Sequence, residues 1–98
     1  MSRTFGLPEG ATHREGDAGV GMGERHVVNL SNGYGASIVR GLYSYGGSEG
    51  LWELGVLGPE GRLTYATPIT NDVLGWLTDE MVTDVLQRIA DLPTASRS

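Results

Sequence analysis

The residues of this chain that could take part in chemistry are few and lie far apart. No cysteine is present among the 98 residues, which excludes thiolate metal ligands, thiol nucleophiles and disulfide bonds. Neither His13 nor His26 has a partner at a ligand spacing such as H-x-x-x-H, so the sequence predicts no metal site. Ser37 lies outside a G-x-S-x-G elbow, and its nearest base, His26, is expected beside Arg40, which opposes that role. We therefore expect no catalytic residues and no cofactor.

Two carboxylates, Glu49 and Glu53, come nearest to an acid–base pair. They flank the start of a predicted strand in which Trp52, Leu54 and Val56 alternate onto one face. Glu53 then lies on the opposite face, away from the predicted core. We favour solvated surface acids over a catalytic pair.

The stretch best suited to binding is residues 43–50, with the sequence YSYGGSEG, between two predicted strands. Tyrosine gives a large contact area at a low cost in entropy, and glycine lets another chain approach the backbone closely. The alternative is a long glycine-rich hairpin loop whose tyrosines fold onto the edge of the sheet. The candidate binding residues here are Tyr43, Tyr45, Gly46, Gly47, Glu49 and, from the preceding strand, Arg40.

Charge defines a second candidate surface. The chain has twelve acidic and seven basic residues, a net charge of −5, and residues 71–92 alone hold five acids and one arginine. Nucleic acid requires a cationic surface that this chain lacks, so we expect no direct contact with nucleic acid. The acidic region either mimics DNA phosphates or is an ordinary solvated helix face, and we favour the second. Its candidate binding residues are Asp79, Glu80 and Asp84.

The strands that hold these residues begin with a predicted hairpin over residues 25–42, whose turn carries an Asn-Gly signal. A strict two-residue turn would pair apolar with polar side chains. A loop of three or five residues, with Gly33 or Gly35 left-handed, instead puts the apolar side chains on one face. In the register that we expect, Val28 lies opposite Ile38.

A second predicted hairpin spans residues 51–66 and turns at 58–61. Leu63 and Tyr65 lie on its return strand, opposite the apolar face of the first strand. Pro68 ends the return strand because it has no amide hydrogen to donate to a ladder.

The C-terminal third of the chain is predicted to be helical. Residues 70–76 form a short helical turn whose Trp76 packs onto the sheet. Thr78 is a good N-cap for the main helix, which has acids in its first turn. The apolar residues that recur at helical spacing are Met81, Val82, Val85, Leu86 and Ile89.

These elements predict an α+β fold, a four-stranded and mostly antiparallel β-meander with the C-terminal helix packed on one face. Residues 1–24 are glycine-rich and lack apolar periodicity, which predicts a flexible arm. The domain is then 25–92, and 93–98 form a polar tail. So small a core favours a homo-oligomer, preferably a dimer. Apolar residues left on the second face of the sheet favour the same conclusion: Val27, Val39, Leu42, Leu51 and Leu57.

Four stretches resemble a group of small uncharacterised proteins of actinobacterial phages and prophages: SNGYGASIVR at 31–40, YGG at 45–47, GLWEL at 50–54 and TPITNDVLGWL at 67–77. The resemblance covers about residues 25–92. It implies no activity, catalytic residue or cofactor, only a cytosolic protein of an infected or lysogenic bacterium. The absence of an apolar run of roughly 20 residues, and of a secretory signal at the start, favours the same compartment.

Two functions fit this sequence. The first is a small acidic, non-catalytic protein that binds a host or phage protein through residues 43–50, the acidic helix, or both. The second is a protein that sequesters a small molecule or nucleotide in a pocket at a subunit interface, which requires Arg25 and Arg40 to converge with a tryptophan or tyrosine. We favour the first, and we expect no membrane partner.

Overall fold

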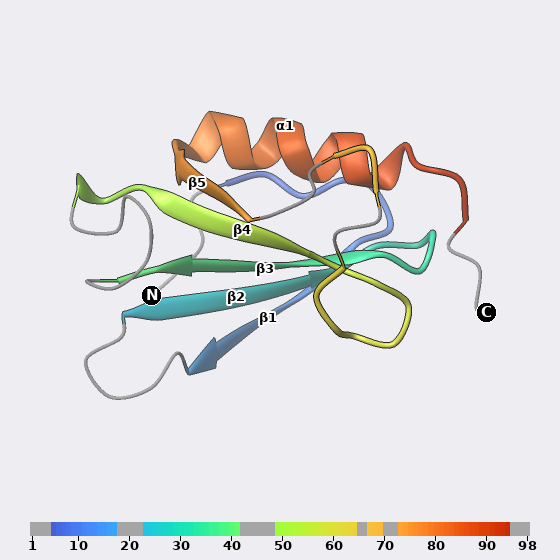
Figure 1. Ribbon diagram of the computed structural model, residues 1–98, viewed down its shortest axis with the longest axis horizontal. Coiled ribbons are helices and arrows are strands. Elements are labelled where there is room, and N and C mark those ends of the chain that lie inside the picture. The colour runs from blue at the N-terminus through green and yellow to red at the C-terminus, as the bar shows by residue number, and fades with distance from the viewer. Residues whose placement is uncertain (1–4, 18–22, 42–48, 65–66, 70–72, 95–98) are drawn as a thin grey trace.

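The computed structural model describes residues 5–17, 23–41, 49–64, 67–69 and 73–94 of the chain. It has one antiparallel sheet with the strand order β1-β2-β3-β4-β5, and a C-terminal helix covers one face of that sheet (Figure 1). The elements in chain order are β1 (Thr12–Asp17), β2 (Glu24–Asn29), β3 (Gly35–Arg40), β4 (Trp52–Leu57), β5 (Leu74–Leu77) and α1 (Asp79–Ala90). The predicted α+β class and antiparallel meander are confirmed.

The prediction of four strands is wrong, because the sheet has five. The strand at its first edge, β1, lies within the segment that was expected to be a flexible arm. β1 is in register with β2 along its whole length, from Thr12 opposite Asn29 to Asp17 opposite Glu24. Its sequence, THREGD, contains no apolar residue, so hydrophobic alternation could not reveal it.

The residues that precede β1 are also part of the folded unit. Phe5 is only 2% exposed and belongs to the core cluster. The Gly6 N–H donates to Thr83 Oγ1 over 2.8 Å, which fastens this segment to α1. The folded unit therefore includes residues 5–17, which were expected to lie outside it.

At the opposite edge of the sheet, β5 takes the place that residues 62–66 were expected to fill. β5 pairs antiparallel with β4. Leu63 forms only an isolated bridge with Leu57, and its side chain is 50% exposed. Tyr65, which was expected to pair with β4, lies outside the described residues.

The hairpin of β2 and β3 has the odd loop that the sequence predicts. Gly33 in this loop has a φ of +94°, the left-handed conformation that favours glycine. The expected pairing of Val28 with Ile38 is wrong by two residues, because Val28 lies opposite Ala36. A shift of two residues leaves every side chain on its own face, so the apolar face is as predicted.

Both ends of α1 are capped by side chains. Thr78 is the N-cap, as predicted: its Oγ1 accepts from the Met81 N–H at 3.2 Å, and its own N–H donates to Met81 Sδ at 3.5 Å. At the other end, the Asn32 amide donates to the carbonyl oxygens of Ile89 and Leu92 at 2.8 and 3.1 Å. The β2–β3 turn therefore also fixes the end of the helix.

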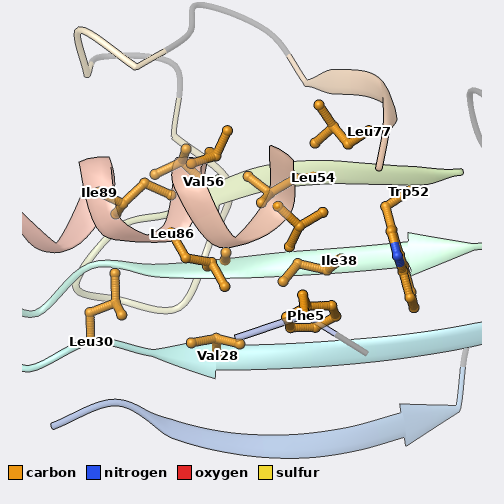
Figure 2. Packing of buried hydrophobic residues seen from close by; sticks show 13 residues of the cluster. Phe5, Val28, Leu30, Ile38, Trp52, Leu54, Val56, Leu77, Leu86 and Ile89 are labelled. Carbon is orange, nitrogen blue, oxygen red and sulfur yellow. The ribbon is translucent and has the colours of Figure 1, made fainter. Parts of the chain in front are cut away.

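The core lies between α1 and the sheet (Figure 2). Trp76 was predicted to pack there, but it is 58% exposed, and the neighbouring Leu77 is buried instead. Met81, which belongs to the helical series of apolar residues, is 49% exposed. The core predictions that hold include Val28, Ile38, Trp52, Leu54, Val56, Val82, Val85, Leu86 and Ile89.

The second face of the sheet is partly covered by the chain itself. Val27 and Leu57 are 4% and 6% exposed. Gly55 makes room for Leu63 on this face, since a Cβ at position 55 would lie 2.5 Å from Leu63 Cδ2. This covering removes part of the reason for expecting a dimer, which stays a prediction.

Candidate functional site

A group of polar side chains lies on the helix-facing side of β1 and β2. His13 and Glu15 are two residues apart on β1, and Glu24 and His26 are two residues apart on β2, so each pair shares one face of its strand. Glu15 lies opposite His26. The two histidines are therefore diagonal neighbours across the strands.

Aromatic rings enclose His26, which is completely buried. The ring of Phe5 meets it edge-on, with centroids 5.5 Å apart and planes at 90°. Trp52 meets it at 5.4 Å and 70°, and the ring of His13 lies end to end with it, with centroids 5.0 Å apart and planes at 22°. Because water has no access to this ring, both of its nitrogens need partners within the protein.

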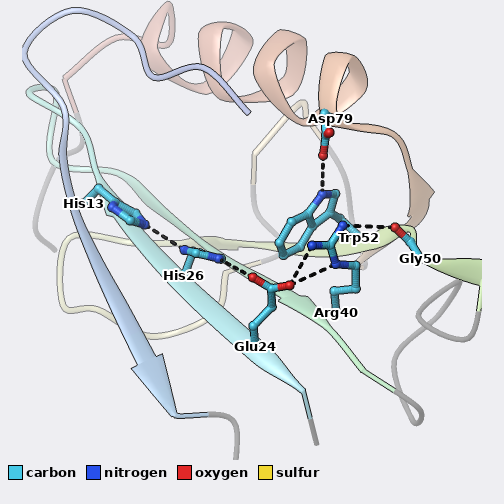
Figure 3. Close-up of polar contacts among 7 residues, drawn as sticks. All are labelled: His13, Glu24, His26, Arg40, Gly50, Trp52 and Asp79. Atoms are coloured by element: carbon cyan, nitrogen blue, oxygen red, sulfur yellow. Dashed lines mark hydrogen bonds and ion pairs between the residues drawn. The ribbon is translucent and has the colours of Figure 1, made fainter. Parts of the chain in front are cut away.

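Those partners form a continuous chain of hydrogen bonds (Figure 3). His26 Nε2 lies 3.0 Å from Glu24 Oε2, and His26 Nδ1 lies 2.8 Å from His13 Nε2. A carboxylate only accepts, so Nε2 of His26 carries a proton. In the neutral ring Nδ1 is then an acceptor, and the His13 Nε2–H donates to it. The proton positions thus follow from one carboxylate.

Glu24 accepts hydrogen bonds at the other end of this hydrogen-bonded series. Its Oε1 accepts from Nε and Nη2 of Arg40 at 3.1 and 2.6 Å. Burial raises the pKa of the Glu24 carboxyl, but the hydrogen bonds from His26 and Arg40 outweigh it, and the pKa lies below its ordinary value. Glu24 is therefore a carboxylate at neutral pH.

Arg40 and Trp52 connect this group to the helix. The Arg40 guanidinium carbon lies 4.0 Å from the centroid of the Trp52 ring, and Nη1 donates to the Gly50 carbonyl oxygen at 3.2 Å. Trp52 Nε1–H donates to Asp79 Oδ1 at 2.7 Å in the first turn of α1. Among the described residues, no buried side-chain nitrogen or oxygen lacks a hydrogen-bond partner. We call His13, His26, Glu24, Arg40, Trp52 and Asp79 the polar network.

The structure divides the predicted binding residues into three groups. Arg40 and Asp79 are engaged inside the polar network. Glu80 and Asp84 are exposed on α1, and Glu49 is exposed beside the start of β4. The residues of the predicted binding loop that lie outside the described part of the chain are Tyr43, Tyr45, Gly46 and Gly47.

Most of the polar network was not predicted from the sequence. His26 was expected beside Arg40, but Glu24 lies between them, because Glu24 is the residue opposite Arg40. The useful signal was the spacing of two residues in His13-x-Glu15 and Glu24-x-His26, which puts each pair on one face of a strand. Ligand spacings typical of helices, such as H-x-x-x-H, do not include such pairs.

Together with the neighbouring Glu15, the polar network has one chemical capacity besides holding the strands together. One donor atom each from Glu15, Glu24 and His26 lie within 4.8 Å of one another, so these residues could hold a metal ion. The six residues of the network include no hydroxyl or thiol nucleophile. The arrangement therefore favours binding over covalent catalysis.

A second site is a groove of about 470 Å³ between β5 and α1. Its apolar lining includes Leu77 and Met81, and its charged residues are Glu80, Asp84 and Arg88. The full lining is Leu74, Leu77, Thr78, Glu80, Met81, Asp84, Val85 and Arg88. We call it the β5–α1 groove.

Trp76 stands on the strand that borders this groove. It has a φ of +60°, and no other non-glycine residue of the described ranges has a positive φ. An L-residue in this conformation costs on the order of 1–2 kcal/mol, and for a bulky side chain it is uncommon. The backbone is therefore strained at Trp76. The indole side chain of Trp76 is nevertheless 58% exposed to solvent.

The fold and these two sites define a small α+β protein with a buried polar network and an exposed groove. Comparison with protein-family models, with curated proteins and with solved structures finds no match for the chain. The resemblance to phage and prophage proteins therefore stays a prediction. None of the described helices has the length and apolar character needed to cross a membrane.

Proposed function

We propose that this chain is a non-catalytic binding protein that engages another protein through the β5–α1 groove, in the cytosol of a bacterium that carries a phage or prophage. The observation that carries the proposal is the exposure of Met81, at 49%, within a groove that also contains acidic side chains. Exposed large apolar residues gathered around a groove are typical of interaction sites.

The edge strand supports this proposal. Within the described part of the chain, β5 has a strand neighbour only on the side of β4. An exposed edge offers unpaired backbone groups to an added strand, and the neighbouring groove receives alternate side chains of that strand. Trp76 on the same strand is of a residue type enriched in binding hot spots.

Charge specifies the partner's chemistry. The groove holds Glu80 and Asp84 against Arg88, a net charge of −1, in a chain with a net charge of −5. A segment that carries lysine or arginine between apolar residues complements it. The proposed occupant is therefore an extended, basic and apolar segment of a host or phage protein.

The alternative of nucleotide sequestration is less well supported. Arg40, one of the two arginines that this function requires, does meet a tryptophan. However, Trp52 is completely buried, and the Arg40 guanidinium is bonded to Glu24 and to the Gly50 carbonyl oxygen. These groups leave no open aromatic face for a base.

A peptide selection tests the proposal. A displayed library of random linear peptides is selected against the purified full chain, and enriched peptides are synthesised and titrated by calorimetry. We expect sequences in which apolar residues alternate with lysine or arginine. Met81→Gln keeps a side chain suited to the third position of a capping box but removes the apolar contact, and should weaken binding at least about tenfold, or about 1.4 kcal/mol.

Matched variants complete the test. Asp84→Lys should weaken binding to a similar extent, and Gln87→Ala, on an exposed part of α1 outside the groove, should leave the affinity unchanged. Failure to enrich any peptide, or equal affinity for the Met81→Gln variant, would contradict the proposal. A concentration-dependent dimer that the peptide dissociates would make a second copy of the chain the occupant instead.

A further inference from the structure

The carboxylates of two neighbouring strands converge on the buried histidine. Glu15 comes from β1, and Glu24 and His26 come from β2; one donor atom from each lies within 4.8 Å of the other two. Glu15 is exposed, Glu24 is partly buried and His26 is fully buried. The cluster therefore runs from the solvent to the inner face of the sheet.

We propose that Glu15, Glu24 and His26 bind a first-row divalent metal ion such as Zn²⁺, and that His13 positions His26 for ligation. Imidazole nitrogen together with carboxylate oxygen is a donor set that suits these ions. This site is independent of the β5–α1 groove.

The two histidines support the proposal because the hydrogen bond between them can form with either tautomer of His26. Without metal, Nε2 of His26 carries a proton and Nδ1 accepts from His13. With metal on Nε2, His26 is protonated at Nδ1 instead and donates to Nε2 of His13 across the same 2.8 Å contact. A ligating histidine commonly donates its second ring N–H in this way, which fixes its orientation. Both rings change tautomer together, so the neutral pair keeps its number of protons.

Arg40 is placed to assist and does not block the site. Its guanidinium bonds Oε1 of Glu24, whereas Oε2 is the oxygen that faces His26. Oε2 can therefore coordinate an ion while Oε1 remains bonded to Arg40. The positive charge of Arg40 also offsets the repulsion between two neighbouring carboxylates.

Calorimetric titration of the full chain with ZnCl₂ at pH 7.5 tests this proposal, with Co²⁺ and its visible absorption as a second probe. We expect one ion per chain. Glu15→Gln changes an exposed ligand without disturbing the core and should lower the affinity at least about tenfold. Glu60→Gln, an exposed acid in the turn after β4, is the matched control and should bind like the wild type.

The variant His13→Gln tests whether His13 orients His26 for metal binding or only contributes to the packing around it. It removes the imidazole that accepts from His26 and should lower Zn²⁺ affinity by about 10- to 100-fold, the range typical of groups that orient a ligand. Circular dichroism and thermal unfolding without metal show whether each variant is folded. The proposal is overturned if Zn²⁺ does not saturate a site, or if folded Glu15→Gln binds it as tightly as the wild type.

Discussion

The polar network and the β5–α1 groove depart from the usual distribution of side chains in opposite directions. In the polar network, a fully buried histidine and a partly buried arginine–glutamate pair lie beneath Phe5 and α1. At the groove Met81 is 49% exposed to solvent, and Trp76, on the strand that borders the groove, is 58% exposed. Both regions border the same small core, so its size alone explains neither.

The difference lies in how each region is closed. At the network, the segment before β1 supplies Phe5, and every buried side-chain nitrogen or oxygen of the described residues has a partner. At the groove, the described residues leave one side of β5 without a strand neighbour, and the backbone at Trp76 is strained. A closed, satisfied polar cluster fits a fixed internal structure or a small ion, whereas an open apolar edge fits a second chain.

The largest effect on stability is expected from removal of the Phe5 ring, which packs against the polar network. Phe5→Ala removes a ring that contacts His26 and Trp52 and leaves a cavity above them. We expect the free energy of unfolding to fall by about 3–5 kcal/mol, as measured by urea denaturation. Leu63→Ala, at a half-exposed side chain, should cost far less, and equal costs would mean that the segment before β1 is not part of the core.

A smaller effect is expected from Glu24→Gln, which removes the charge that both His26 and Arg40 bind. Hydrogen bonds to a charged acceptor contribute more than neutral ones, so the loss should be about 1–3 kcal/mol at pH 7. Calorimetric or denaturant unfolding at pH 7 measures it. A variant as stable as the wild type would show that the network contributes nothing to folding.

The same carboxylate predicts a pH dependence. Because the pKa of Glu24 is lower in the folded protein than its ordinary value of 4.5, the group stabilises the fold above that pH. This contribution is lost as the pH falls through the lower, folded-state pKa. Below pH 4.5 the stability of the wild type should therefore fall more steeply than that of Glu24→Gln, as followed by thermal unfolding at a series of pH values. Parallel curves for the two proteins would contradict the assigned role.

The smallest change in stability is expected at the open edge. Trp76→Asn replaces a side chain that is 58% exposed and has a φ of +60° with a residue that tolerates the left-handed conformation. We expect stability to stay the same or to rise by up to about 1 kcal/mol, while affinity for a peptide bound in the groove falls. A clear loss of stability would mean that Trp76 is a structural residue.

The parts of the fold that the sequence predicted correctly depend on local patterns. Thr78 begins the helix as a capping residue, and Gly33 occupies the left-handed position of the β2–β3 loop. The parts that were missed depend on contacts distant in the sequence. β1 has no apolar alternation because its inward side chains, His13 and Glu15, face the polar network and not an apolar core.

The β5 edge of the sheet, near α1, shows a second reason why parts of the fold were not predicted from the sequence. The sequence LGWL resembles the end of a helical turn, because Gly75 and an apolar residue on either side fit that pattern. Pairing with β4 and a positive φ at Trp76 override this local preference. The candidate groove was likewise not predictable, because it exists only where β5 lies beside α1.

One titration distinguishes the two regions most directly. Two-dimensional NMR of the full chain during addition of ZnCl₂ follows the ring nitrogens of His13 and His26 together with the methyl group of Met81. We expect Nε2 of His26 to lose its proton and to change its chemical shift strongly, while the chemical shift of the Met81 methyl group stays the same. Zn²⁺-dependent shifts at Met81 with no change at His26 would contradict the assignment of the ion to the polar network and of the groove to a protein partner.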